Sequence, residues 1–268
     1  MTILLNQNRD FQILCEKPVE DVKINVQASA SGNESPIAVM KRYEYKYFLD
    51  PIQKEKLIAG MKGHMMEDRY GLTSIASLYY DTPDYRLIRA SNDKPAFKEK
   101  IRLRSYGPAS GDSPVFLELK RKAHDIVYKR RVQTTIPQVS DFFERKGELC
   151  EAGQINNEIT FFRDFYKDLK PSCLIVYDRT AYFEPYGDLR LTIDDAPRYR
   201  MDDMSLDHLE DGIHLLDDGI SILEIKVQDA MPLWLCRILS EGKIYKNSFS
   251  KYGEAYRREM IDPSRKEN

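Results

Sequence analysis

The chain has 268 residues, of which 42% are apolar and 11% aromatic, so it is long enough to bury a core without a stabilising disulfide or metal. Its formal net charge of −2 argues against a protein that binds polyanions over its whole surface, because such a surface carries a clear basic excess. Its four cysteines form no C-x-x-C pair, which excludes a common zinc pattern and suggests reduced thiols.

Membrane and secretion signals are also missing from the sequence. No run approaches the roughly 18 apolar residues that cross a bilayer, and the N-terminus lacks a basic start followed by an apolar stretch. We therefore expect a soluble, cytoplasmic protein with no membrane span.

The predicted elements follow a flexible N-terminal segment, residues 1–37, and precede a short tail, 263–268, so that 38–262 form one domain. Period-two alternation predicts eight strands, and hairpin-length turns between several of them favour antiparallel neighbours. The strands are Arg42–Leu49, Ser74–Asp81, Phe97–Tyr106, Val115–Arg121, Val127–Ile136, Cys173–Phe183, Asp188–Asp195 and Ser221–Val227. Helical patterns cover Pro51–Met66, Ile155–Leu169, Pro232–Glu241 and Ser250–Met260.

Charge is unevenly distributed along these elements. Residues 97–131 hold ten Lys and Arg against four Asp and Glu, whereas 184–229 hold thirteen acids against four bases. Within 97–106, every second residue from Lys98 to Arg104 is cationic, so four cations share one face of a strand. The same phasing occurs in Glu118 with Lys120 and in Glu224 with Lys226. A local cationic site is therefore indicated.

This pattern predicts an α+β fold, and if the eight antiparallel strands form a closed β-tunnel, their charged faces point inward and the helices pack on the outside. Repelling charges inside such a tunnel need counter-charge, which a polyanion with a divalent metal would supply. Rows of Arg and Lys can bind a phosphate chain through charge-assisted hydrogen bonds. Carboxylates among them can bind Mg²⁺ or Mn²⁺. Glu224 is the leading ligand candidate, followed by Glu44 and Glu118.

Eight short motifs, in order, are similar to the catalytic domain of the vacuolar transporter chaperone (VTC) polyphosphate polymerases, which are triphosphate tunnel metalloenzymes related to CYTH-type triphosphatases and adenylyl cyclases. They are Arg42-Tyr-Glu-Tyr-Lys, Ser77-Leu-Tyr-Tyr-Asp-Thr, Lys100-Ile-Arg-Leu-Arg, Leu117-Glu-Leu-Lys, Tyr177-Asp-Arg-Thr, Leu189-Arg-Leu-Thr-Ile-Asp, Leu223-Glu-Ile-Lys and Phe249-Ser-Lys-Tyr. The resemblance extends from about residue 38 to 260. It implies transfer of the ATP γ-phosphate to a growing polyphosphate chain, with Mn²⁺ or Mg²⁺.

The resemblance also implies roles for individual residues. The residues implied to contact phosphate in catalysis are Lys46, Arg102, Arg104, Lys120, Arg179, Arg190 and Lys226. Those implied to bind the polyphosphate chain are Arg42, Lys100, Lys129, Arg131, Ser250 and Lys251. The implied metal ligands are Glu224, Glu44 and Glu118. CYTH hydrolases begin with Glu-x-Glu-x-Lys. Arg42 replaces the first Glu here, which shifts the expectation toward a polymerase.

Several alternatives stay open at this point. The cationic row of 98–104 is also typical of a solvated edge strand, and Glu224 with Lys226 of a surface ion pair. A tripolyphosphatase or nucleoside triphosphatase would use the same tunnel, and a polyphosphate-binding module would use it without turnover. Nucleic acid is disfavoured as a partner, because the cations are predicted to point inward without aromatic platforms beside them. ATP and polyphosphate remain the expected partners.

Overall fold

The computed structural model of the chain describes residues 43–93, 95–123, 126–149 and 153–262. The chain divides into two units, Met1–Ala38 and Val39–Asn268, and every described residue belongs to the second. The predicted segments 1–37 and 263–268, and Arg42, lie outside the described residues. A search of the described helices finds none long and apolar enough to span a bilayer.

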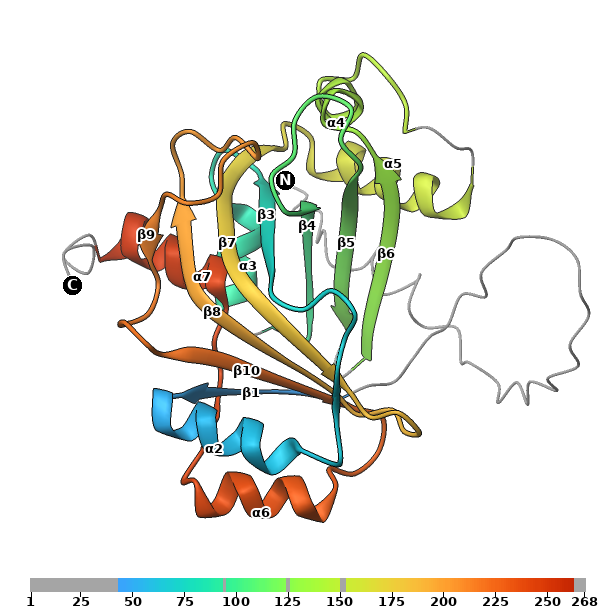
Figure 1. Ribbon diagram of the computed structural model, residues 1–268. Helices are drawn as coiled ribbons and strands as arrows, with labels where there is room; N and C mark the ends of the chain where they lie inside the picture. Colours follow the sequence, from blue (N-terminus) through green and yellow to red (C-terminus); the bar gives the residue numbers. More distant parts are fainter. Residues whose placement is uncertain (1–42, 94, 124–125, 150–152, 263–268) are drawn as a thin grey trace, which may run out of the picture. The chain divides into compact units, whose positions relative to one another are not determined.

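Within the described residues, eleven strands form one antiparallel sheet (Figure 1). They are β1 (Tyr43–Leu49), β2 (Met66–Glu67), β3 (Thr73–Asp81), β4 (Phe97–Tyr106), β5 (Val115–Ala123), β6 (Ile126–Thr134), β7 (Lys170–Phe183), β8 (Arg190–Arg200), β9 (Ile213–His214), β10 (Ser221–Val227) and β11 (Lys246–Asn247). The hydrogen-bonded order is β11-β1-β10-β8-β7-β3-β4-β5-β6, with β2 on β7 and β9 on β8. The eight long strands correspond to the eight predicted ones, and the three two-residue strands were not predicted.

The helices are α2 (Pro51–Met61), α3 (Arg86–Asn92), α4 (Ile136–Phe143), α5 (Gln154–Tyr166), α6 (Leu233–Glu241) and α7 (Lys251–Tyr256), which continues as one π-helical segment, η1 (Arg257–Ile261). Helices α3 and α4 were not predicted. The start of α4 carries a readable signal, because Thr135 and Gln138 form a capping box with Pro137 in the first turn. The alternation predicts Ile136 as the last residue of a strand, whereas it is the first residue of α4.

Two pairs of helices cover the apolar side of the sheet, as predicted. Helices α4 and α5 pack Phe142 and Ile159 against Leu103 and Leu117 of β4 and β5. Helices α2 and α6 lie side by side under β1 and β10 (Figure 1), where Leu57 and Leu235 join a core with Leu223. Each of these positions is almost fully buried, so burying these apolar faces stabilises the sheet by about 25 cal/mol per Å².

Helix α7 departs from the prediction that all helices pack outside. Its Tyr252 belongs to a third cluster with Ile75 of β3 and with Ile175 and Tyr177 of β7, which lie on the opposite side of the sheet from Leu174 and Val176. Strand β7 is buried on both faces from Cys173 to Tyr177. A strand of that kind needs an apolar partner on each side, and α7 supplies the second one.

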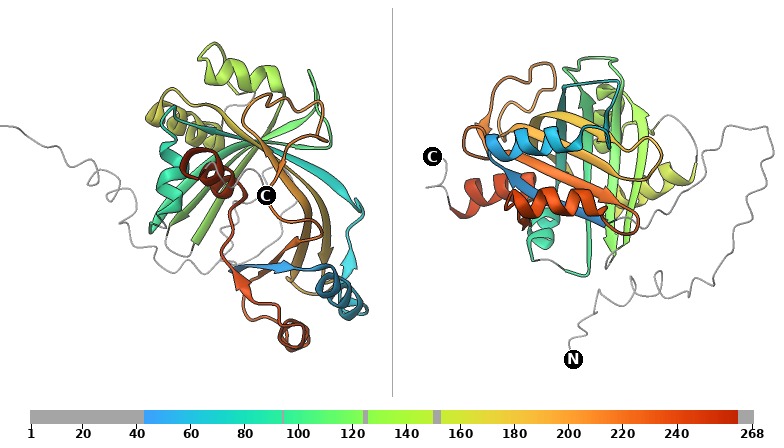
Figure 2. Two further views of the ribbon diagram at one scale, coloured as in Figure 1. Left: turned by 90° about the vertical axis from the view of Figure 1, so that its left-hand side faces the viewer. Right: turned by 60° about the horizontal axis from the view of Figure 1, so that its bottom comes forward.

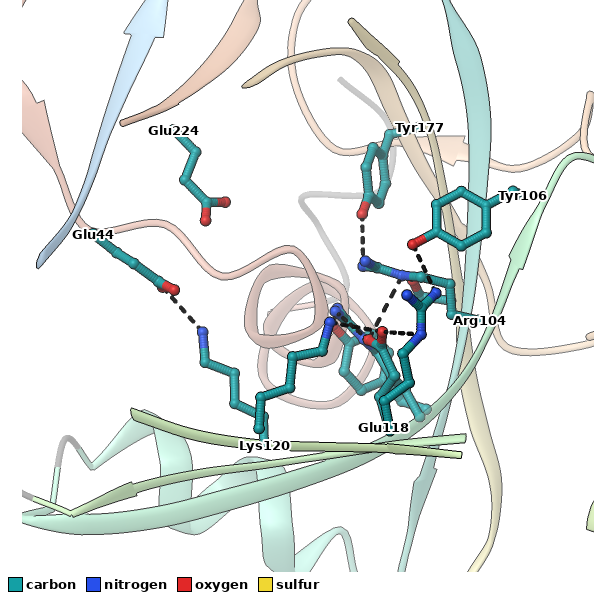
Figure 3. A network of polar contacts seen from close by, with 12 residues as sticks. Glu44, Arg104, Tyr106, Glu118, Lys120, Tyr177 and Glu224 are labelled. Carbon is teal, nitrogen blue, oxygen red and sulfur yellow. Dashed lines mark hydrogen bonds and ion pairs between the residues drawn. The ribbon is translucent and has the colours of Figure 1, made fainter. Parts of the chain in front are cut away.

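Closure of the sheet into a tunnel is not seen among the described residues. The hydrogen-bonded path ends at β6 on one side and at β11 on the other, and these two edges do not pair with each other. Side chains nevertheless reach across, because Lys120 of β5 donates to Glu44 of β1 at 3.0 Å. Strands from the two ends of the path therefore face each other over a shared space (Figure 3).

Candidate functional site

The strand register brings most of the predicted site residues onto one face of the sheet, which we call the charged face. It comprises Glu44 and Lys46 of β1, Lys100, Arg102 and Arg104 of β4, Glu118 and Lys120 of β5, Lys129 and Arg131 of β6, Arg179 of β7, Arg190 and Asp194 of β8, Glu224 and Lys226 of β10, and Ser250 and Lys251 at the start of α7. The predicted Arg42 lies outside the described residues. Arg190 lies at the end of its row, where it donates to the backbone oxygens of Gly187 and Leu189.

Glu118 is the buried centre of the first cluster on the charged face. Its side chain is 1% exposed, and Arg102 and Lys129 approach its two oxygens at 2.9 and 2.8 Å. Arg131 lies at 3.3 Å and Arg104 at 3.9 Å. Burial alone would raise the pKa of Glu118, but Arg102, Arg104 and Lys129 outweigh it and lower that pKa well below its usual range. With cations on both oxygens, Glu118 is better placed as a counter-ion than as the predicted metal ligand.

Asp194 is the centre of the second cluster and was not among the predicted site residues. It is fully buried, and Arg179 binds it in a bidentate manner at 2.5 and 2.8 Å. Lys251 of α7 pairs with the same carboxylate at 2.5 Å. Burial opposes ionisation, but Lys251 and Arg179 lower the pKa of Asp194 to about 2. Its spacing of four residues from Arg190, on the same face of the strand, was the available sequence signal.

Tyrosine hydroxyls extend these clusters, and sequence reasoning assigned them no role. Tyr177 accepts a hydrogen bond from Arg104 at 2.9 Å, and Tyr79 accepts one from Arg102 at 3.1 Å. Figure 3 shows the Tyr177 hydroxyl pointing toward Arg104. Burial opposes ionisation of Tyr177, but Arg104 and Arg179 lower the pKa of its phenol to about 8.

Strands β1 and β10 carry a third arrangement, in which charges alternate between neighbours. Glu44 lies opposite Lys226, and Lys46 lies opposite Glu224. Glu224 pairs with Lys226 at 2.9 Å, and Lys226, Lys46 and Arg179 overcome burial to lower its pKa well below the usual range. These cations therefore favour the ionised form of the Glu224 carboxylate.

Lys100, Lys46 and Arg190 differ from the other described cations of the charged face, because no described carboxylate lies within ion-pair distance of their charged groups. Lys100 donates to Ser250 Oγ at 3.1 Å, and Lys46 donates to the backbone oxygen of Phe249 at 3.0 Å. Burial, then Lys46 and further cations, lower the pKa of Lys100 to about 7. Burial likewise lowers the pKa of Lys46. These two ammonium groups, beside the start of α7, are available for an added anion.

The donors near Glu224 fit a divalent metal that is shared with a phosphate ligand. Thr192 lies opposite Glu224 on β8, is 8% exposed, and its Oγ1 has no hydrogen-bond partner. Glu44 lies diagonally across on β1 (Figure 3). The described residues contain no group of three or more acidic, His or Cys side chains that would hold a metal alone. Mg²⁺ commonly binds through one or two carboxylates plus substrate phosphates, so Glu224 with Glu44 is a sufficient protein contribution.

An antiparallel α+β protein whose sheet collects cations from many strands on one face has the arrangement expected of a triphosphate-binding tunnel protein. The VTC domain family matches residues 41–259, and the chain belongs to this family. The family includes polyphosphate polymerases, and membership implies binding of phosphate or nucleotide. No curated protein matches the chain.

Solved structures with a similar arrangement are distant in sequence. A candidate adenylate cyclase from Bacillus halodurans is 14% identical, covers 79% of this chain and 96% of its own, and has a TM-score of 0.46. One from Vibrio parahaemolyticus is 11% identical, with 80% and 97% covered and a TM-score of 0.42. A protein from Pyrococcus horikoshii is 14% identical, with 80% and 97% covered and a TM-score of 0.39.

Proposed function

We propose that this chain is a metal-dependent polyphosphate polymerase that transfers the γ-phosphate of ATP to the end of a growing polyphosphate chain. The observation that carries the proposal is the charged face itself, where cations from separate strands gather around two buried carboxylates, Glu118 and Asp194. Lys46 and Lys100 add positive charge without forming an ion pair with a described carboxylate. A linear polyanion is the ligand that matches a surface of this kind.

Positioning and charge neutralisation would account for catalysis at such a site, without a protein nucleophile. An oxygen of the acceptor's terminal phosphate attacks the γ-phosphorus of ATP, the bond to the β-γ bridging oxygen breaks, and ADP leaves. The attacking oxygen is already ionised at neutral pH, so no general base is required. Arg102, Arg104 and Arg179 would bind the equatorial oxygens of the γ-phosphate, so that the attacking and leaving oxygens lie in line. Mn²⁺ or Mg²⁺, held by Glu224 and Glu44, supplies further neutralisation of phosphate charge when bound.

The reaction products separate this proposal from its alternatives. Purified protein incubated with ATP and Mn²⁺ is expected to form long polymer on a gel, together with ADP, and a matched reaction containing a chelator is expected to form none. Orthophosphate without polymer would instead identify a triphosphatase. Tight, salt-sensitive binding of polyphosphate without any turnover would identify a binding module.

Anion binding should also depend on pH through Lys100. Its pKa of about 7 means that the ammonium loses its proton above pH 7, whereas a bound anion stabilises the charged form. Tripolyphosphate should therefore bind with proton uptake, and its affinity should fall as pH rises from 7 to 9, by up to about tenfold per unit for one proton. The groups that act on Lys100 are Lys46, Lys98, Lys120 and Arg102, with Ser250 and Tyr252 of α7 in contact.

Calorimetry in two buffers of different ionisation enthalpy measures that uptake directly. Lys100→Arg is the matched variant, because arginine stays charged throughout this range. The difference in proton uptake between the two proteins excludes the protons that tripolyphosphate itself gains or loses. Equal proton uptake by both proteins at pH 8 would show that Lys100 is already charged in the free protein.

A further inference from the structure

Asp81, in the motif Ser77-Leu-Tyr-Tyr-Asp81-Thr, has no part in the proposed chemistry, although its carboxylate lies deep in the protein. Asp81 ends β3, is 1% exposed, and forms no ion pair with a described cation within 4.0 Å. Its Oδ1 accepts from the backbone amides of Thr82 and Leu87 at 2.9 and 2.8 Å. Its Oδ2 accepts from the amide of Ile88 at 3.0 Å and from the hydroxyl of Tyr252 at 2.9 Å.

The backbone bonds fix the start of α3. Amides of the first helical turn lack partners within the helix, and Asp81 accepts from two of them, those of Leu87 and Ile88. Thr82 Oγ1 accepts from a third, that of Arg86, at 2.9 Å. The end of β3 thus acts as the cap of α3 and holds this helix at one place on the sheet.

The remaining bond reaches α7, directly beside two residues of the charged face. Tyr252 follows Ser250 and Lys251, and its hydroxyl also lies 2.5 Å from Ser172 Oγ. Its ring stacks on Tyr79 with centroids 4.7 Å apart. The same side chain therefore connects the carboxylate at the end of β3 with the turn that opens α7.

Helix α3 adds a second restraint on α7. A Cβ atom at Gly253 would lie 2.7 Å from Asn92 Oδ1 of α3, so the two helices are in close contact at this glycine. Because Asp81 sets the position of α3 and also binds Tyr252, both restraints on the first turn of α7 depend on one carboxylate. That turn presents Ser250 to Lys100 and Lys251 to Asp194.

We infer that Asp81 is a positioning residue for anion binding. Through Tyr252 and α3, Asp81 holds Ser250 and Lys251 beside Lys100 on the charged face. The inference rests on the proposed function only in assigning a phosphate chain to that part of the face. Tyr252→Phe is the informative variant, because it removes the hydroxyl, keeps the ring on Tyr79, and leaves the bonds between Asp81 and the backbone intact. Ser172→Ala is its matched control, since it removes the other partner of the same hydroxyl.

Calorimetric binding of tripolyphosphate, measured without ATP, tests the inference independently of turnover. Tyr252→Phe should weaken binding by about fivefold to tenfold, the effect of one buried hydrogen bond, while thermal unfolding shows that the protein stays folded. Ser172→Ala should weaken it by less than about threefold. Unchanged affinity in Tyr252→Phe, or no binding by the unmodified protein, would overturn the inference. Failure to make polymer from ATP would count against the proposed function alone.

A double-mutant cycle distinguishes positioning from a general structural effect. If Tyr252 acts through the first turn of α7, Tyr252→Phe should weaken tripolyphosphate binding by a smaller factor in Ser250→Ala than in the unmodified protein, because one of the two groups that it positions is already gone. A merely structural role predicts that the two losses multiply. Multiplying losses would therefore reject the inference even if each single variant binds poorly.

Discussion

Replacing Glu224 by Gln is expected to reduce polymer formation at least about hundredfold while leaving the fold intact, because a neutral amide is a poor ligand for Mn²⁺ or Mg²⁺. The carboxylate lies on the charged face, and Lys226, Lys46 and Arg179 keep it ionised in spite of its burial. Glu224 pairs with Lys226 at 2.9 Å. When a metal and a phosphate bind together, Glu224 would bind the metal and Lys226 would bind the phosphate. The rate of polymer synthesis from ATP and Mn²⁺, and the affinity for Mn²⁺ in the presence of tripolyphosphate, are the two measurements.

Glu158→Gln provides the matched control for this experiment. Glu158 of α5 also pairs with cations, Arg130 at 2.9 Å and Arg121 at 3.4 Å, but it lies on the opposite side of the sheet. Its replacement should leave the rate within about twofold, because surface and half-buried ion pairs contribute little by themselves. If Glu224→Gln keeps most of its activity and its affinity for Mn²⁺, Glu224 is not the metal ligand.

Alternation made much of the sheet predictable. The bounds of β4 and β10 agree with the predicted Phe97–Tyr106 and Ser221–Val227, because charged and apolar side chains alternate over most of each strand. Strand β7 shows the limit of this reasoning. From Cys173 to Tyr177 it is buried on both faces, and a run of this kind does not reveal which element covers the second face. The position of α7 was missed for that reason.

The site was predictable as a set of cations but not as a set of pairs. Residue phasing placed Arg102 and Lys120 on one face, yet only the order of strands decides that β6 lies beside β5 and brings Lys129 to Glu118. The same limit applies to Asp194, which Lys251 reaches from a helix 57 residues further along the chain. Contacts between elements so far apart in sequence depend on tertiary packing, which local patterns do not contain.

Replacing Glu118 by Gln should destabilise the free protein by about 3–5 kcal/mol, because it removes the one carboxylate shared by four cations. Arg102, Lys129, Arg131 and Arg104 all lie within 3.9 Å of it. After the replacement these cations repel one another at a site where solvent screens them poorly. A phosphate chain would restore the missing negative charge. Tripolyphosphate should therefore raise the unfolding temperature of Glu118→Gln more than that of the unmodified protein.

Glu99→Gln separates this effect from a simple loss of a buried ion pair. Glu99 lies on the opposite face of β4, is 5% exposed, and binds Arg121 at 2.9 Å and Tyr166 at 2.7 Å. Its replacement should also lower the unfolding temperature, but tripolyphosphate should not recover the loss, because the anion does not reach that side of the sheet. Equal recovery of the two variants would mean that Glu118 is a structural partner only. Selective recovery would mean that the protein folds around a carboxylate which occupies the place of a phosphate until the substrate binds.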